Sequence, residues 1–512
     1  MMKPSNKSIL SWLVPALGAL AIIALSWWRL VVQNGDYLYE AQENSFWMAD
    51  VSHDEPGGWF SWAGRYLTQF FYHPALGASL LIGLWLVIYG QWLYALRLGW
   101  QWCWVALALP LTLLWSVTSL GYAIYVSKVP DWCFTPTLYV AFMGLFLVVG
   151  RWFSLRFRLA WCAVVLIALG VGAERFMANA EVPAPGRSLF HGALADKNFH
   201  AELRMTRAAD AGDWNVVLSE MRHAQRPTRA MWLLKNAALL NQGRLAEDWL
   251  DYPMMTVMPA FNDSVAVPMV ESCGPLLYFL YGNIQFAYRW NMENMVEYGP
   301  TVRRLRHMTR CAIVKCEWDL AEKYLSLLER TTFWSGWARE QRRFLHQPQA
   351  VADDPYYRIP LAISQTPENI LDGDMGHLEP YLSNSLPHMK FHKCAPLAEL
   401  SIVFTMQTQV IRDFWNQLYI YATLRAEAGD TSMPRTVQEA ALLYQSLEPQ
   451  SAPQAQLPFD PAVVQSYQRF LQRSQQLMAQ GFSDEALANA LKREFGHTFF
   501  WFYYFCRNLK TY

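Results

Sequence analysis

Charged residues are scarce in this chain of 512 residues. Asp, Glu, Lys and Arg account for 16% of the sequence and hydrophobic residues for 53%, whereas an ordinary soluble domain is roughly 25% charged. The 42 basic residues balance the 42 acidic ones, so no positive excess favours nucleic acid, and we expect no such partner. The mean hydropathy is only +0.05, because the apolar residues are concentrated before Met177. This pattern indicates a membrane protein.

The sequence also lacks the short motifs of several enzyme classes. Its eight cysteines include no CxxC pair, which argues against a disulfide framework or a zinc site. No GxSxG, GxxxxGKS, GxxxxGKT or GxGxxG sequence is present, and these mark serine hydrolases, nucleotide hydrolases and dinucleotide-dependent enzymes. We therefore expect no cofactor, and the interpretation leans toward a protein without enzymatic activity.

Long apolar runs are what the chain does contain. A membrane-spanning helix needs roughly 20 mostly apolar residues. The first run is too long for a removable signal peptide and lacks a small-residue cleavage site, so it is interpreted as an uncleaved anchor. Within a membrane domain at 1–178 we predict spans at 9–32, 75–96, 102–122, 134–149 and 159–176.

Basic residues near the ends of these spans predict the orientation. Lys7 precedes the first span, Arg97 lies between the second and third, and Arg151 and Arg156 lie between the fourth and fifth. Since Lys and Arg favour the cytoplasmic side, we expect a multi-pass inner-membrane protein with a cytoplasmic amino terminus. Everything after Met177 would then lie outside, which in a bacterium is the periplasm. The spans contain almost no ionisable residue, which argues against a transporter.

Amphipathic helices with almost no alternating runs follow from Pro183 onward. The stretches AADAGDWNVVLSEM, NAALLNQGRLAEDWL and RCAIVKCEWDLAEKYLSLL resemble one another, with turns at Gly212, Gly243 and Cys316. These turns lie 31 and 73 positions apart, close to one and two tetratricopeptide periods of roughly 34 residues. The predicted fold class is all-α, with multi-spanning transmembrane helices followed by a soluble tetratricopeptide-like helical-repeat domain at 179–446. An irregular helical domain with chance similarity is the alternative.

The last part of the chain, 447–512, is predicted to be a Pro-rich linker and a terminal helical cap. Gly481 is expected to end one helix and Ser483 to begin the next as its N-cap. The closing sequence HTFFWFYYF, from His497, is too aromatic to remain in water. We expect it either to dock against the outer domain or to touch the bilayer interface.

Acidic residues gather after the first predicted span, at the outer side of the membrane. A carboxylate in such a loop can act as a general base or hold a metal at a phosphate. In this respect the loop resembles that of membrane glycosyltransferases that use polyprenyl-phosphate sugars, and Asp36, Glu40 and Asp54 are the candidate catalytic residues. A solvated loop whose charge follows from topology is the favoured interpretation.

An amphipathic helix is predicted at 58–73, immediately before the second span. Its polar side holds Ser61, Arg65, Thr68 and Tyr72. The opposite side is aromatic, and we expect it to rest in the membrane interface. Whether this helix also borders an active site depends on the acidic residues before it. The predicted interfacial residues are Trp59, Trp62, Tyr66, Phe70 and Phe71.

Two further patterns are weak metal candidates. Asp372 and Asp374 form a DxD sequence, which can hold a divalent cation but is also ordinary turn chemistry. His388 and His392 lie four residues apart, which on a helix would place both imidazoles on one face. No glutamate completes an HExxH motif, so no metal is assigned.

Three segments carry a resemblance to a known family. They are YLYEAQENSFW at 37–47, GGWFSWAGRYLTQFFYHPALGA at 57–78 and FGHTFFWFYYF at 495–505. Together they resemble an uncharacterised family of bacterial inner-membrane proteins, a domain of unknown function with several amino-terminal spans and a long helical region. The resemblance implies this architecture and an envelope location, but it implies no activity and no site residue.

The sequence therefore leaves two functional hypotheses. The leading one is an integral inner-membrane protein whose periplasmic helical-repeat domain binds an envelope protein or peptide, with the lipid bilayer as its other partner. Concave grooves of stacked helical repeats commonly hold such partners. The alternative is a membrane glycosyltransferase-like enzyme that acts on a lipid-linked sugar through the acidic first outer loop.

Overall fold

The computed structural model describes most of the chain, at 4–49, 58–118, 124, 131–180, 197–224, 227–253, 266–364, 394–409, 411–453 and 459–506. Every regular element in these residues is a helix, and no strand occurs among them. The predicted all-α class is confirmed for the described part of the chain. Asp54, Asp372, Asp374, His388 and His392 lie outside the described residues.

The apolar amino-terminal part consists of long helices joined by short helical turns. Its elements are α1 (Pro4–Trp27), η1 (Trp28–Gln33), α2 (Gly35–Glu43), α3 (Gly58–Thr68), η2 (Gln69–Tyr72), α4 (Pro74–Leu96), η3 (Cys103–Leu107), α5 (Ala108–Val117), α6 (Phe134–Val149), η5 (Gly150–Trp152) and α7 (Leu155–Ala180).

The described remainder of the chain is also helical. Its elements are α8 (Lys197–Ala211), α9 (Trp214–His223), α10 (Arg229–Asn241), α11 (Leu245–Asp248), α12 (Ala266–Leu280), α13 (Ile284–Tyr298), α14 (Val302–Val314), α15 (Trp318–Leu328), α16 (Ser335–Gln341), η8 (Arg342–Phe344), α17 (Pro348–Asp353), α18 (Arg358–Ser364), α20 (Ala395–Thr408), α21 (Ile411–Glu427), α22 (Arg435–Leu447), η9 (Pro449–Ser451), α23 (Pro461–Ala479), α24 (Asp484–Phe495) and α25 (Phe499–Phe505). The longest of these helices, α23, has 19 residues.

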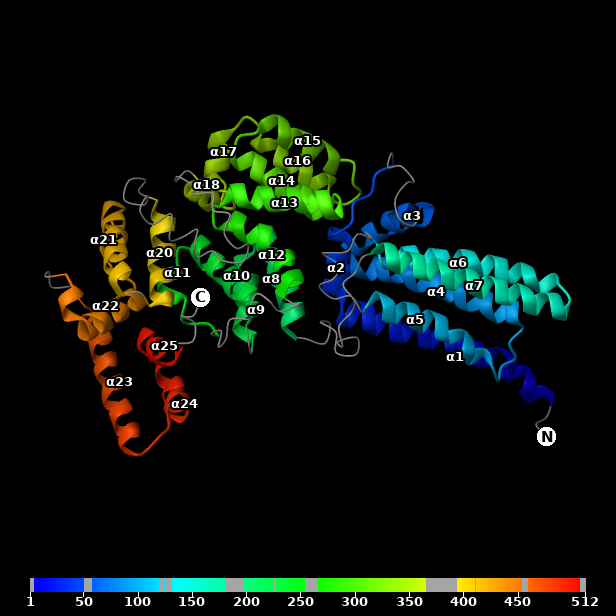
Figure 1. The fold of residues 1–512 in the computed structure, drawn as a ribbon, viewed down its shortest axis with the longest axis horizontal. Helices are drawn as coiled ribbons and strands as arrows, with labels where there is room; N and C mark the ends of the chain where they lie inside the picture. The colour runs from blue at the N-terminus through cyan, green and yellow to red at the C-terminus, as the bar shows by residue number, and fades with distance from the viewer. Residues whose placement is uncertain are drawn as a thin grey trace. The chain divides into compact units, whose positions relative to one another are not determined.

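Four helices are long and apolar enough to cross a membrane. They run over Ser11–Gln33, Pro74–Leu96, Phe134–Trp152 and Arg156–Phe176, and they correspond to four of the five predicted spans. The third predicted span, 102–122, is a shorter apolar helical stretch at Cys103–Val117. Figure 1 shows α1, α4, α5, α6 and α7 running alongside one another, and direct contacts join α1 to α4, α4 to α6 and α6 to α7.

The chain divides into two compact units. Unit 1 contains 1–203, 290–312 and 317–345, and unit 2 contains 204–289, 313–316 and 346–512. Most of α14, together with α15 and α16, therefore belongs to the same unit as the apolar helices. The sequence pattern, which separates these segments by more than a hundred residues, does not indicate this grouping.

The turns between consecutive helices share one geometry. Gly212, Gly243 and Cys316 all have positive φ, at +75°, +66° and +57°. In the first turn Gly212 N–H donates to Ala209 O at 3.1 Å and Asp213 N–H donates to Ala208 O at 2.8 Å. The same two bonds recur around Gly243 and Cys316, and they define the Schellman motif that ends a helix. The three turns therefore share one local backbone geometry, which Gly282, Gly429 and Gly481 also adopt.

The terminal elements pack within unit 2. Gly481 has φ +79° just after α23, and the Ser483 hydroxyl accepts Ala486 N–H at the start of α24, as the sequence predicts. The aromatic helix α25 contacts α22 and α24, and Figure 1 shows it at the end of the α23–α24 hairpin. Phe502 is fully buried and meets Trp249 edge-on, with ring centroids 5.1 Å apart. The aromatic sequence therefore docks within unit 2.

Candidate functional site

The first part of the acidic segment after the first span, Gly35–Glu43, is a helix rather than an open loop. Asp36 lies in the first turn of α2, where a carboxylate complements the helix dipole, and it accepts Tyr37 N–H at 2.8 Å. One oxygen of Asp36 also lies 2.9 Å from His200 Nδ1. One of the three candidate carboxylates is therefore held against a histidine of the same unit.

The other acidic residues of α2 form a buried ion network with α14, which we call the α2–α14 network. Glu40 is paired with Arg303. Glu43 lies 2.9 Å from Arg303 Nη2 and 2.6 Å from Arg306 Nη1. Glu40 is only 1% exposed and Arg306 only 4%. A carboxylate held this way is not presented to bulk solvent.

Aromatic and backbone contacts surround this network. The guanidinium of Arg306 lies 3.9 Å from the ring centre of Trp334, a cation–π contact, and the Trp334 indole N–H donates to Gln42 Oε1 at 3.2 Å. Val302 N–H, at the start of α14, donates to Ser45 O at 3.2 Å. All of these groups lie in unit 1, so the network fastens α2 to α14 within that unit.

The predicted amphipathic helix is present as α3 followed by η2, and Pro74 begins α4 directly after it. Its polar side chains Ser61, Arg65 and Thr68 are buried, whereas Trp59 and Tyr66 are 61% and 40% exposed. A helix that faces water exposes its polar side chains, whereas this helix buries them and exposes aromatic rings on the protein surface. Among the predicted interfacial residues, Trp62 and Phe70 are partly buried, and Phe71 is fully buried against Phe134.

Gly64 explains why α3 can lie so close to α6. A methyl group added at Gly64 would approach Asp131 Oδ2 and the Thr135 hydroxyl within 2.4 Å. Asp131 in turn accepts Cys133 N–H and Thr135 N–H, at 2.9 and 2.6 Å, and so caps the amino terminus of α6. No group of three or more His, Cys, Asp or Glu side chains that could hold a metal occurs in the residues that the structure describes.

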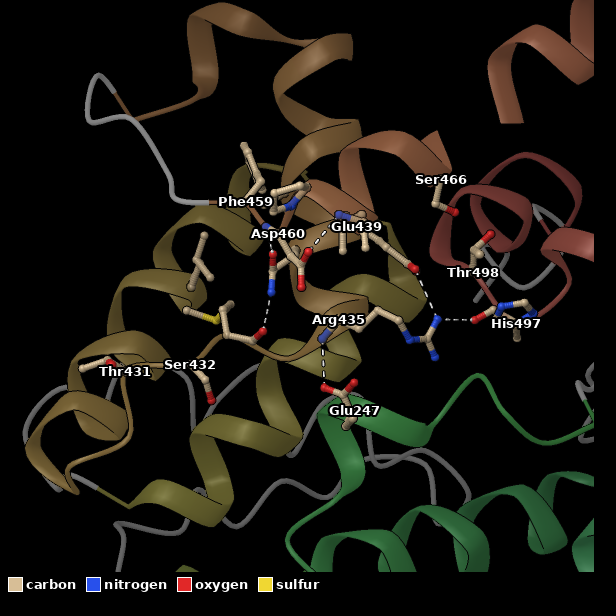
Figure 2. Close-up of a pocket in the computed structure, with 17 residues that line it drawn as sticks. Glu247, Thr431, Ser432, Arg435, Glu439, Phe459, Asp460, Ser466, His497 and Thr498 are labelled. Atoms are coloured by element: carbon tan, nitrogen blue, oxygen red, sulfur yellow. Dashed lines mark hydrogen bonds and ion pairs between the residues drawn. The ribbon is translucent and has the colours of Figure 1, made fainter. Parts of the chain in front are cut away.

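A cleft with a volume of about 960 Å³ opens in unit 2. Its walls come from α22, from the start of α23 and from the segment that precedes α25, as Figure 2 shows. Its lining mixes apolar and polar side chains, namely Leu418, Met433, Phe459, Pro461 and Val463 with Glu247, Arg435, Gln438, Glu439, Asp460, Ser466, His497 and Thr498.

Arg435, the first residue of α22, ties three parts of the cleft together. Its backbone N–H donates to Glu247 Oε2 at 2.9 Å. Its guanidinium donates to Asp251 Oδ1 at 2.9 Å, to the carbonyl of His497 at 3.0 Å and to Glu439 Oε1 at 3.2 Å. Figure 2 shows Arg435 between Glu439 and His497. One residue thus joins α22 to three other parts of unit 2, at Glu247, Asp251 and His497.

Glu439 is the acidic group with the most unusual environment in the cleft. It is 2% exposed, and its Oε2 accepts Phe499 N–H at 2.7 Å, at the start of α25. Burial raises the pKa of Glu439 to about 7, although the nearby Arg435 and the Phe499 N–H act in the opposite direction. A carboxyl group that is half protonated near neutral pH therefore joins α22 to the terminal helix.

Asp460 and Gln438 join the start of α23 to α22. The Asp460 carboxylate caps α23 by accepting Ala462 N–H at 2.8 Å, and Asp460 N–H donates to Gln438 Oε1 at 2.7 Å. The Gln438 amide donates to Met433 O at 2.6 Å. Backbone and side-chain bonds thus hold the start of α23 against α22, and Phe459 and Pro461 contribute apolar rings to the lining.

Sequence reasoning did not find this cleft. The only local signal is the i, i+4 pair of Arg435 and Glu439 on one helix, a spacing that places opposite charges side by side. The contributions of Glu247 and His497 come from segments far from α22 in sequence, so no local pattern reveals them. The same holds for Arg303 and Arg306, which meet α2 across about 260 residues.

One family model matches residues 173–507, and its description is "Family of unknown function (DUF6057)". The matched residues begin within α7 and include the whole cleft and the terminal aromatic helix. They do not include 37–47 or 57–78, two of the three segments on which the resemblance rests. No curated protein and no solved structure matches the chain.

Proposed function

The chain belongs to this family of unknown function, DUF6057, and on that premise we propose that it is a membrane-anchored binding protein. Its helical region displays the cleft between α22, α23 and the start of α25. This cleft holds a peptide segment of another envelope protein. The observation that carries the proposal is the cleft itself, which is open, of substantial volume and braced by bonds from α22 to His497 and to Asp460.

The size and lining of the cleft support a peptide as its ligand. A volume of about 960 Å³ is at the upper end of the roughly 300–1,000 Å³ of small-molecule pockets. Its apolar side chains, such as Phe459 and Val463, can take the side chains of a peptide, while hydroxyls such as Ser466 can bond its backbone. This combination of apolar contacts and convergent polar groups is typical of recognition sites.

The charges of the cleft favour a segment with a basic side chain. Glu247 and Asp460 line it together with the partly protonated Glu439, and Arg435 is the one arginine or lysine among the described lining residues. Complementary charge contributes to partner choice and to the rate of association. We therefore propose a partner segment that carries Lys or Arg beside apolar residues.

The proposed location is a bacterial inner membrane, with the amino terminus in the cytoplasm and unit 2 in the periplasm. This orientation needs an odd number of crossings, so the shorter helical stretch of η3 and α5 has to cross as well. Five 3₁₀ residues and ten α-helical residues span about 25 Å, close to the roughly 30 Å hydrocarbon thickness. Arg97, Arg151 and Arg156 then lie on the cytoplasmic side, as the positive-inside rule favours.

We further propose that the helix pairs after α7 form a tetratricopeptide-like stack. The recurrence of the same left-handed turn at Gly212, Gly243 and Cys316 supports it. Gly282 has φ +79° and the same pair of backbone bonds, and it lies between the second and third of these turns. Such stacks bury their faces against neighbouring repeats and leave grooves for partners.

Site-specific photo-crosslinking in cells tests the binding proposal. A photoactivatable amino acid is placed at Ser466, which lines the cleft on α23, and separately at Met478, which is 54% exposed on the same helix. We expect a defined partner band from position 466 and none from position 478. Mass spectrometry of the band should identify one recurring peptide that contains Lys or Arg.

The control distinguishes cleft binding from chance proximity. If positions 466 and 478 give the same products, or if position 466 gives none, the proposal of a peptide-binding cleft is wrong. A variant with Arg435→Ala should lower the yield at position 466, because it releases the braces to His497 and Asp251.

A further inference from the structure

A second hollow lies among the apolar helices of unit 1. It has a volume of about 620 Å³, and it is lined by residues of α5, α6 and α7 together with Phe60 and Trp92. The lining is almost entirely apolar, with side chains such as Leu113, Val140 and Leu169. We call it the span groove.

One end of the span groove carries a positive charge. Arg175 lines the groove, is exposed, and lies next to the last residue of the candidate span Arg156–Phe176. Within the described part of the chain no carboxylate is paired with it. Phe176, the next residue, meets Trp132 edge-on with ring centroids 5.1 Å apart. The groove therefore combines an apolar interior with a cationic, aromatic rim at the end of a span.

From this arrangement we infer that the span groove is a binding site for an anionic membrane lipid. One acyl chain lies along the apolar wall between α5, α6 and α7, and the phosphate of the headgroup is bound by Arg175. The inference concerns a site other than the peptide-binding cleft and does not depend on it.

The surroundings of the groove favour a lipid over other ligands. The helix α7 is packed loosely, since only 6% of its span window is buried within the protein. Its neighbours α4 and α6 are themselves long enough to cross a membrane. A hollow between such helices, if inserted, is bathed in acyl chains, and a basic residue at the level of the headgroups attracts anionic lipids. Arginine also suits phosphate oxygens geometrically.

Glycine positions on the helices provide a way to close the groove without disturbing its walls. Gly170 lines the groove, and a methyl group added there would meet no atom within 4 Å. The change Gly170→Phe should therefore fill the hollow rather than displace a neighbour. Gly83, on α4, is equally open but does not line the groove, so Gly83→Phe is a matched control.

The test uses the full chain in nanodiscs of phosphatidylcholine. The probe is phosphatidylglycerol with a diazirine in its acyl chain, and the neutral comparison is phosphatidylcholine with the same group. After illumination, labelled peptides are quantified by mass spectrometry. We expect the anionic probe to label 109–116, 132–140 and 166–176 about fivefold more than the neutral probe, as one arginine near the surface allows.

The variants distinguish binding of the lipid's acyl chain from binding of its phosphate headgroup. Gly170→Phe should reduce labelling of these segments to the level seen around Phe157, a side chain outside the groove that is 74% exposed, whereas Gly83→Phe should not. Arg175→Gln should retain acyl-chain labelling but lose the preference for the anionic probe.

Two results would overturn the inference. One is equal labelling by both probes in the unsubstituted chain. The other is labelling of the groove segments that Gly170→Phe leaves unchanged. If Gly170→Phe does not accumulate as folded protein, Arg175→Gln is compared with the unsubstituted chain instead, because this exposed side chain can be changed without filling any space. An unchanged preference for the anionic probe in Arg175→Gln would then overturn the inference.

Discussion

At the scale of single residues, Glu439 makes the stability of the chain depend on pH. Its pKa in the folded protein is raised to about 7, chiefly by burial, above the usual value for glutamate. The folded state therefore holds the proton more tightly than the unfolded state. The resulting stability is complete below about pH 4.5 and is lost as pH rises toward 7, by about 3 kcal/mol in all.

The change Glu439→Gln removes this titration while keeping an amide oxygen that can accept Phe499 N–H. We expect the melting temperature of the purified chain to fall less between pH 5 and pH 8 in the variant than in the unsubstituted protein. Thermal unfolding at several pH values measures this fall in melting temperature for both proteins. Identical pH profiles for the two proteins would show that Glu439 does not titrate as proposed.

Among the elements, α2 depends on the α2–α14 network for its position. Glu43→Gln leaves Arg303 and Arg306 buried with one carboxylate fewer, and breaking a buried pair in this way costs about 3–5 kcal/mol. Glu322→Gln is the control, because Glu322 pairs with Arg342 at 3.1 Å on an exposed surface, and such pairs contribute less than about 1 kcal/mol. We expect the melting temperature to fall clearly only for Glu43→Gln, and equal effects would contradict this account.

The repeated turns make a second prediction about elements. Gly243 and Cys316 adopt the same left-handed backbone, which costs a residue with a Cβ about 1 kcal/mol. Gly243→Ala should therefore destabilise the chain, and Cys316→Gly should stabilise it, each by about 1 kcal/mol. Cys316→Ala is the control for the thiol, since it keeps the strained backbone. If Cys316→Ala stabilises as much as Cys316→Gly, backbone strain is not the cause.

Elements were the level at which the sequence was most informative. Apolar runs located four long helices, and Gly and Ser located the turn and cap at Gly481 and Ser483, because these features depend on neighbours along the chain. The 102–122 run was predicted as one continuous helix, whereas its described residues form a short 3₁₀ turn followed by α5, with Pro110 near the start of α5. The ion network and the cleft could not be predicted, because Glu43 and Arg306, or Glu247 and Arg435, meet only through tertiary folding.

For the whole molecule, the proposed topology can be tested with cysteine labelling. Cys316 is exposed, and Ser154, between α6 and α7, is exposed as well. With Cys506→Ser in both proteins, because Cys506 is partly exposed in unit 2, a membrane-impermeant maleimide added to spheroplasts should label Cys316 but not a Ser154→Cys variant that also carries Cys316→Ser. Permeabilisation should then allow labelling at position 154. Labelling of both positions from outside would contradict the orientation, although it would leave the cleft proposal untouched.

The central claim is that the cleft of unit 2 binds a peptide. Its most direct test is the affinity of the crosslinked peptide, made synthetically, for the purified full chain. Ser466→Trp fills the cleft, whereas Met478→Trp adds the same side chain elsewhere on α23. We predict that Ser466→Trp weakens binding at least about tenfold, a loss of about 1.4 kcal/mol, and that Met478→Trp does not change it. Equal affinities for the unsubstituted chain and both variants would contradict the claim.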